Sequence, residues 1–240
     1  MRKVEGVVTG IVKEIDAARA RVKLEFSWMK ETDQNPEPSY KSNWAPIAAP
    51  MSGKNRGMFM MPEKGDEVLV AFDHNYMDHP YVIGFLWNGV DKSPEDGTGP
   101  GVRRLKTVSG HVIEFDDRTG KENILIKTQG EHEIAMKDSA QPSITVKSKG
   151  GQSITLSDVN STVTIETKGG QKIKVSDVPP EISASLVGGI SISATPSGVM
   201  ITAPSILTVN VPVAQFTGVV QASAIVSGGY TPAPGNIFGL

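Results

Sequence analysis

The sequence Lys149-Gly-Gly-Gln-Ser-Ile-Thr-Leu-Ser-Asp158 returns shortly afterwards as Lys168-Gly-Gly-Gln-Lys-Ile-Lys-Val-Ser-Asp177. Two earlier stretches, Gly110-His-Val-Ile-Glu-Phe-Asp-Asp117 and Gly130-Glu-His-Glu-Ile-Ala-Met-Lys-Asp138, follow the same order of glycine turn, apolar–polar alternation and aspartate. A repeat of about twenty residues is typical of a stacked architecture. The alternation with a period of two indicates strands, and glycine supplies the positive φ of a tight turn. The repeated unit is therefore predicted to be strand, turn, strand.

The predicted strands are short, and each has an apolar face only two or three residues wide. Further strands are expected over residues 124–128, 144–148 and 163–167, before three of the turns. One chain cannot bury such narrow faces on itself, and it would also leave bare strand edges. Three chains wound about one axis would enclose Ile, Leu and Val and leave Thr, Lys and Ser in water. The sequence thus predicts an intertwined homotrimeric β-helix, with a single-chain β-sandwich or solenoid as the alternative.

Composition limits the classes of function. The 240 residues carry a net charge of -2, which gives no electrostatic case for nucleic-acid binding. Cysteine is absent and only four histidines are present, so neither a thiol nucleophile nor a zinc site is expected. The N-terminus lacks the apolar run of a signal peptide, so synthesis in the cytoplasm is expected. Helix signals are nearly missing, which predicts an all-β protein.

The first hundred residues read as a separate unit. Alternating or apolar runs predict strands over residues 4–15, 21–28, 44–49, 57–61, 66–72 and 81–86, with a polar loop over 29–43. In the second of these strands, Val22, Leu24, Phe26 and Trp28 should share one face. About five strands with long, glycine-kinked members are typical of a small closed barrel of the OB type.

Several ordered motifs in this unit resemble one known family. They are Trp44-Ala-Pro-Ile-Ala-Ala-Pro-Met-Ser-Gly53, Pro62-Glu-Lys-Gly-Asp-Glu-Val-Leu-Val70, Asp78-His-Pro-Tyr-Val-Ile-Gly84 and Trp87-Asn-Gly89. Together they look like the OB domain of contractile-tail spike proteins, which include gpV-like phage baseplate spikes and the spike portion of VgrG proteins. The segment Lys106-Thr-Val-Ser-Gly-His-Val-Ile-Glu-Phe-Asp-Asp117 resembles the start of that family's trimeric β-helix. The resemblance covers roughly residues 4–177.

The resemblance implies a homotrimeric spike that sits on a baseplate hub, contacts inner tube and baseplate components, and can carry a PAAR-type tip protein. This sequence departs from parts of the family pattern. It starts at the barrel, whereas VgrG proteins carry a hub domain first. The stretch 91–101 is too short for the lysozyme domain of some phage spikes. No histidine follows His132, so the metal-binding tip of some phage spikes is not expected.

The C-terminal quarter has no charged residue after Glu181. Small apolar and hydroxyl residues alternate over 182–185, 190–194, 199–203, 206–211 and 216–220. This alternation predicts that the homotrimeric β-helix, which has the form of a three-sided prism, continues through these residues. Two interpretations stay open: an uncharged needle that avoids the cost of driving charge into a bilayer, or a tightly packed prism that happens to lack charge. The last residues break the alternation and are expected to contact a tip protein or to cap the shaft: Tyr230, Pro232, Pro234, Ile237, Phe238 and Leu240.

The expected units are an OB barrel over 1–90, a linker over 91–105, a shaft over 106–227 and a tip over 228–240.

Four sets of residues are candidate sites. Asp117, Asp138, Asp158 and Asp177 recur in every unit, which favours strand-ending aspartates that bond their own turn over paired catalytic carboxylates. His74, His79, His111 and His132 are scattered and have no nucleophile nearby. Met58, Met60 and Met61 fall on a predicted strand as core or interface residues. Arg103, Arg104 and Lys106 form a basic cluster interpreted as a solubilising surface, with hub contact as the minority interpretation.

These observations predict a structural spike that pierces a target envelope when a contractile sheath contracts, with no catalytic residues, metal or cofactor. Three alternatives remain. One is the spike of a type VI secretion apparatus. Another is a trimeric tail fibre or adhesin that binds a receptor. The third is a polysaccharide-degrading β-helix that uses Asp116 or Asp117.

Overall fold

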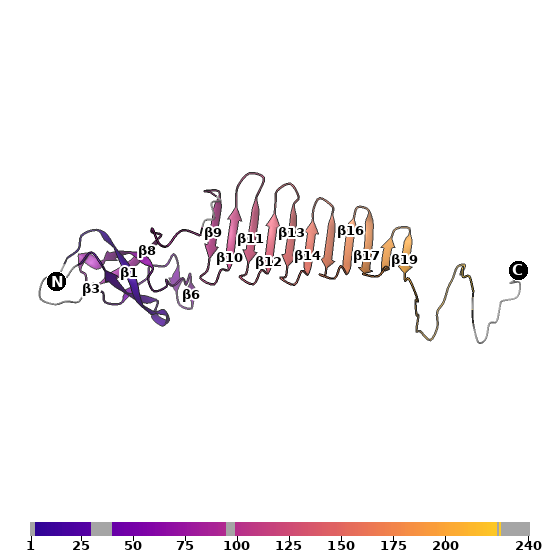
Figure 1. The fold of residues 1–240 in the computed structure, drawn as a ribbon, viewed down its shortest axis with the longest axis horizontal. Coiled ribbons are helices and arrows are strands. Elements are labelled where there is room, and N and C mark those ends of the chain that lie inside the picture. Colours follow the sequence, from indigo (N-terminus) through magenta and orange to yellow (C-terminus); the bar gives the residue numbers. More distant parts are fainter. Residues whose placement is uncertain (1–2, 30–39, 95–98, 225, 227–240) are drawn as a thin grey trace.

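A computed structural model describes residues 3–29, 40–94, 99–224 and 226. The described chain is all-β, as predicted, apart from two short 3₁₀ turns, η1 (Ala17–Arg19) and η2 (Asp73–Asn75). It forms an antiparallel N-terminal sheet and, beyond it along the long axis, a regular sheet whose strands run across that axis (Figure 1).

The N-terminal sheet is an OB-type half-barrel in the order β3-β2-β1-β7-β8, with β4 also paired to β2. Its strands are β1 (Val7–Asp16), β2 (Arg21–Phe26), β3 (Tyr40–Lys41), β4 (Ala45–Pro46), β7 (Glu67–Phe72) and β8 (Pro80–Leu86). A separate hairpin joins β5 (Ser52–Gly53) to β6 (Arg56–Gly57). The predicted strands over 4–15, 21–28, 66–72 and 81–86 are confirmed within a few residues at their ends.

Alternation in β2 builds the core of this half-barrel. Val22, Leu24 and Phe26 are fully buried, together with Val12, Val68, Val70 and Val82 from the neighbouring strands. Trp28, expected on the same face, is about half exposed because β2 ends at Phe26. Its indole Nε1 donates a hydrogen bond to the carbonyl oxygen of Thr9 at 3.1 Å.

The predicted strand over residues 57–61 is wrong. Gly57 has a φ of +149° and closes the β5–β6 hairpin, after which Met58 bonds back to the carbonyl of Met51 at 2.9 Å. Met58 and Met60 are therefore exposed, and only Met61 packs against the core. The run of methionines had the composition of a strand but no neighbouring strand to pair with.

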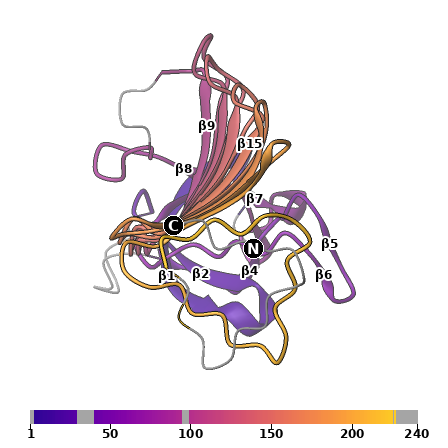
Figure 2. The same cartoon turned by 90° about the vertical axis from the view of Figure 1, so that its right-hand side faces the viewer.

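The long sheet is an antiparallel meander in which each strand pairs with the next along the chain (Figure 1). Its strands are β9 (Val102–Lys106), β10 (Val112–Asp116), β11 (Asn123–Lys127), β12 (Glu133–Lys137), β13 (Ser143–Lys147), β14 (Ser153–Ser157), β15 (Thr162–Glu166), β16 (Lys172–Asp177), β17 (Pro180–Leu186), β18 (Ile190–Thr195) and β19 (Gly198–Thr202). Viewed along its length the stack is curved and twisted (Figure 2). The strand–turn–strand unit predicted from the repeats is confirmed.

The backbone of β10 to β18 is hydrogen-bonded on both sides within one chain. These strands therefore have no bare edges that would require other chains. The side chains on the faces of the sheet, in contrast, remain uncovered. The sheet also begins at Val102, inside the stretch expected as linker, because β9 pairs with β10 from Lys106 back to Val102.

The strands expected over 206–211 and 216–220 are not formed: no strand follows Thr202 among residues 203–224 and 226. Pro204 and Pro212 lack the N–H that a ladder needs, and the glycine turns of the repeats do not continue into this segment. The strands expected over 182–185, 190–194 and 199–203 are confirmed as β17, β18 and β19.

Candidate functional site on the long sheet

Two unbroken lines of apolar side chains run along one face of the long sheet, and we call them the apolar rows. Strand register places every member directly opposite the next. The first row is Phe115, Ile124, Met136, Ile144, Leu156, Val163, Val175, Ile182, Ala194 and Val199. The second row is Ile113, Ile126, Ile134, Val146, Ile154, Ile165, Ile173, Ala184, Ile192 and Ile201. Both rows cross ten consecutive strands, β10 to β19.

Most side chains of the apolar rows are exposed. Typical values are 41% for Ile154, 44% for Ile165 and 50% for Ile173. A monomer seldom exposes a contiguous apolar patch of more than a few hundred Å². A stripe that runs the length of the sheet is therefore a candidate interaction surface.

The opposite face of the long sheet is polar. Thr145, Thr155 and Thr164 lie opposite one another along its centre. Nearer the N-terminal sheet, Arg104 donates to Glu114 at 2.6 Å, and both side chains are only 13% exposed. This face is lined mainly by polar side chains, so the two faces of the sheet are chemically distinct.

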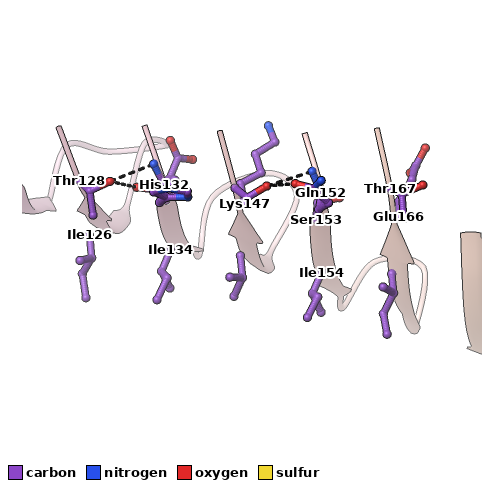
Figure 3. A pocket seen from close by; sticks show the side chains of 14 residues that line it. Ile126, Thr128, His132, Ile134, Lys147, Gln152, Ser153, Ile154, Glu166 and Thr167 are labelled. Atoms are coloured by element: carbon purple, nitrogen blue, oxygen red, sulfur yellow. Dashed lines mark hydrogen bonds between the residues drawn. The ribbon is translucent and has the colours of Figure 1, made fainter. Parts of the chain in front are cut away.

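A groove of 560 Å³ lies along the second apolar row. Figure 3 shows Ile126, Ile134 and Ile154 pointing the same way from β11, β12 and β14, while Thr128, His132 and Gln152 lie at the strand ends. The groove holds no cluster of catalytic groups among the described residues; its floor is aliphatic. Its chemistry is that of a protein–protein contact.

The hairpin turns on one side of the sheet share one hydrogen-bond pattern, and we call them the glycine-side turns: 107–111, 128–132, 148–152 and 167–171. In each, the hydroxyl of the first residue accepts from the backbone N–H of the fifth, for example His132 N to Thr128 Oγ1 at 3.0 Å and Gln171 N to Thr167 Oγ1 at 3.2 Å. The first residue's N–H also donates to the fifth residue's carbonyl. This Ser/Thr is not among the residues predicted from the sequence, although it recurs four residues before each His or Gln.

Two histidines link neighbouring glycine-side turns. Nδ1 of His111 accepts a hydrogen bond from the backbone N–H of Gln129 at 3.2 Å, and Nδ1 of His132 accepts one from Lys149 at 3.4 Å. His74 lies in η2 beside Asp73, at 3.7 Å, and His79 is exposed. The structure thus brings no two of the four predicted histidines into one site and gives His111 and His132 a structural role.

The recurring aspartates lie on the other side of the sheet, at what we call the aspartate-side turns: 117–122, 138–142, 158–161 and 178–179. The expectation that their carboxylates bond their own turns is not met within the described chain for Asp138, Asp158 or Asp177, which are exposed. Asp117 instead pairs with Arg103. The contact with a turn comes from the neighbouring residue, since Asp116 Oδ1 accepts from the backbone N–H of Arg118 at 3.1 Å.

The surroundings of Asp116 lower the pKa of its carboxyl group strongly. Its carboxylate accepts from the Arg118 guanidinium at 2.8 and 2.6 Å, and this hydrogen bonding lowers the pKa of Asp116 to about 2. Glu181 behaves similarly, because the hydrogen bond from Lys174 at 3.1 Å, followed by those from Ser183 and Ser193, lowers the pKa of its carboxyl group. Both groups are carboxylates fixed by cations, which is a structural arrangement and not that of a general acid.

The basic cluster at the start of the sheet is divided by strand alternation. Arg104 is enclosed by Glu114 and by the carbonyl of Pro94 at 2.6 Å, so a solubilising role is wrong for this residue. Arg103 lies on the apolar side opposite Phe115. The six predicted tip residues, Tyr230 to Leu240, lie outside the described residues.

Among the described residues, no group of three His, Cys, Asp or Glu side chains is placed to hold a metal ion. Nor does any helix there have the length and apolar character needed to cross a membrane.

Comparison with known proteins identifies the N-terminal unit. Residues 4–87 match the family model of the type VI secretion system/phage-baseplate injector OB domain. This range contains β1 to β8, the first three motifs quoted for the resemblance, and Trp87, the first residue of the fourth motif.

Curated relatives align beyond that domain. The chain is 29% identical over 115 residues to the type VI secretion system spike protein VgrG3 of Vibrio cholerae, covering 45% of this chain and 11% of that protein. It is 28% identical over 127 residues to the spike protein VgrG1b of Pseudomonas aeruginosa, covering 49% and 17%. It is also 27% identical over 115 residues to the actin cross-linking toxin VgrG1 of Vibrio cholerae, covering 45% and 10%. The chain thus spans less than a fifth of the length of each of these three relatives.

Proposed function

Because this chain belongs to the gpV/VgrG-like family of spike proteins, we propose that it is the homotrimeric central spike of a contractile injection machine. The OB-type half-barrel seats on a baseplate hub. The long sheets of three copies close into a rigid shaft that pierces the target envelope when the sheath contracts. The role is mechanical, and no step of chemistry is assigned to the chain.

The observation that supports this proposal best is the pair of exposed apolar rows. They extend from β10 to β19 without a charged residue, on a sheet whose backbone is already satisfied. Burial of one exposed Ile or Val side chain stabilises an assembly by about 1.5–3 kcal/mol when it is complete. Closing three such faces around an axis covers every row at once and leaves the threonine-rich faces in water.

The remaining parts follow from the same arrangement. We assign residues 106–227, together with β9, to the shaft, of which β9 to β19 form its sheet and the described residues after Thr202 add no strand. The last residues form a tip that docks a PAAR-type protein or caps the shaft. Tyr230, Pro232, Pro234, Ile237, Phe238 and Leu240 are the proposed tip contacts. Inner tube and baseplate components are the other partners, and contact with the target membrane is transient.

The test is the mass of the full chain in solution by light scattering, followed by imaging of the particles and by gels in SDS with and without boiling. We expect a species of three times 25.6 kDa that persists in SDS until heated and forms rods. A folded monomer would remove the spike proposal, and a dimer would replace the prism by a sandwich of two sheets.

A VgrG-like spike of a type VI secretion apparatus is the second candidate, supported by the spike relatives. Affinity purification of the chain from its native cells discriminates the two. Recovery of a type VI membrane complex supports this candidate, whereas recovery of phage tail proteins supports the tail spike.

A further inference from the structure

The glycine-side turns and the aspartate-side turns of the long sheet carry complementary charges, and we infer that these two sets of turns meet between copies. In a closed ring of identical subunits, one side of each sheet faces the opposite side of the next sheet. The glycine-side turns of one copy then lie against the aspartate-side turns of its neighbour. We propose that Lys149 and Lys168 pair there with Asp138, Asp158 and Asp177 of the adjacent copy. This inference rests on the proposed trimer.

The meander sets the heights of these charges. Its turns alternate between the two sides of the sheet (Figure 1), and each turn is displaced from the next by one strand spacing, about 4.8 Å. Rotation about a common axis does not change height. Lys149, in the turn after β13, therefore falls between Asp138 and Asp158 of the neighbouring copy, and Lys168 falls between Asp158 and Asp177.

These charged groups are available for such contacts. Asp138, Asp158 and Asp177 are exposed, and their carboxylates have no ion pair within the described chain. Lys168 is likewise exposed and has no ion pair among the described residues. Lys149 has a side chain 65% exposed and reaches Glu131 at 3.7 Å, which leaves it accessible.

In one pair of turns the signs of the charges are reversed. Glu131 is the acidic residue on the glycine side, and the adjacent aspartate-side turn 117–122 carries Lys121. The other charges of that turn already have partners: Asp117 pairs with Arg103, Arg118 with Asp116, and Glu122 accepts from Gly120 N at 3.0 Å. The height rule places Glu131 between Lys121 and Asp138 of the neighbouring copy, so Lys121 is the opposite charge available to it there.

Lys168 gives the sharpest test, because a five-residue strand of about 16 Å separates it from Asp158 and Asp177 of its own chain. The variants are Lys168→Glu, the double Asp158→Lys/Asp177→Lys, and the triple variant that combines them. The measurement is the dissociation rate of the full-length trimer. Either reversal should raise that rate about tenfold, because attraction becomes repulsion at three junctions. The triple variant should return close to the wild-type rate.

Thr155→Glu is the matched control, since it adds a charge on the polar face away from the turns, and it should dissociate like wild type. Raising the salt to 1 M shortens the screening length to about 3 Å and should reduce the differences between variants. Equal rates for all variants would overturn the charge ladder while leaving the trimer in place, and so would a triple variant no better than its parents. A monomeric wild type would instead overturn the proposed function.

Discussion

Ile154 of β14 and Ile165 of β15 lie directly opposite each other in the second apolar row, and both side chains are more than two-fifths exposed. Neither finds cover within its own chain, although they form the floor of the groove with Ile126 and Ile134. Such pairs follow one another along the whole row, and monomers seldom expose so continuous an apolar surface.

Replacing Ile154 by Asp should abolish the trimer. The change places a carboxylate at the centre of the proposed interface and removes apolar burial, which together cost about 2 kcal/mol or more per chain. Light scattering should report the monomer mass of 25.6 kDa. Thr155→Asp, one residue further and on the opposite face, should keep the trimer; loss of assembly in this control alone would mean that the faces are reversed.

Gly151→Ala should destabilise the sheet by roughly 1–3 kcal/mol per chain. Gly151 has a φ of +87°, and an added Cβ would lie 3.2 Å from the Cβ of Lys168. The denaturant midpoint measures the effect. Gly130→Ala is the comparison in the preceding glycine-side turn, at a position whose φ is not positive and where the nearest atom is 3.8 Å away, and it should cost less. Equal midpoints for the two variants would show that turn geometry does not limit stability.

The Asp116–Arg118 pair should make stability depend on pH in acid. An unfolded aspartate has a pKa of about 3.9, whereas hydrogen bonding from Arg118 lowers the pKa of Asp116 to about 2. Because the folded pKa is the lower one, the stabilisation is present above about pH 4 and is lost as pH falls towards 2. Thermal unfolding across this range should show a fall that is smaller in Asp116→Asn and in Arg118→Gln. Identical profiles for the three proteins would contradict this assignment.

Ser176→Ala should leave stability unchanged or raise it by up to about 1 kcal/mol. Ser176 is 5% exposed, and its hydroxyl has no partner among the described residues. Ser193→Ala is the contrasting change, since the Ser193 hydroxyl donates to Glu181 Oε1 at 3.3 Å, and it should lower the melting temperature. If Ser176→Ala is the more harmful substitution, the Ser176 hydroxyl has a partner in the neighbouring copy.

The repeats predicted the long sheet because each hairpin is specified locally. A glycine such as Gly151 or Gly170 takes the positive φ, and the apolar positions alternate on either side of the turn. The same local reasoning failed for Met58 to Met61 and for residues 206–220. Whether a run of apolar residues becomes a strand there depends on whether a neighbouring strand exists, which composition does not state. The side assignments of Lys168 and Asp158 became clear only once the pairing fixed which turns share an edge.

The strands of the long sheet lie across its length, and this sets how the protein can change its reach. Each hairpin, together with its turn, extends the stack by two strand spacings, about 9.6 Å, whatever the identity of the polar side chains. The length of the stack therefore changes only by whole repeats. Duplication or loss of a repeat would lengthen or shorten the stack by a fixed step while both ends, the half-barrel and the charge-free tail, stay unaltered.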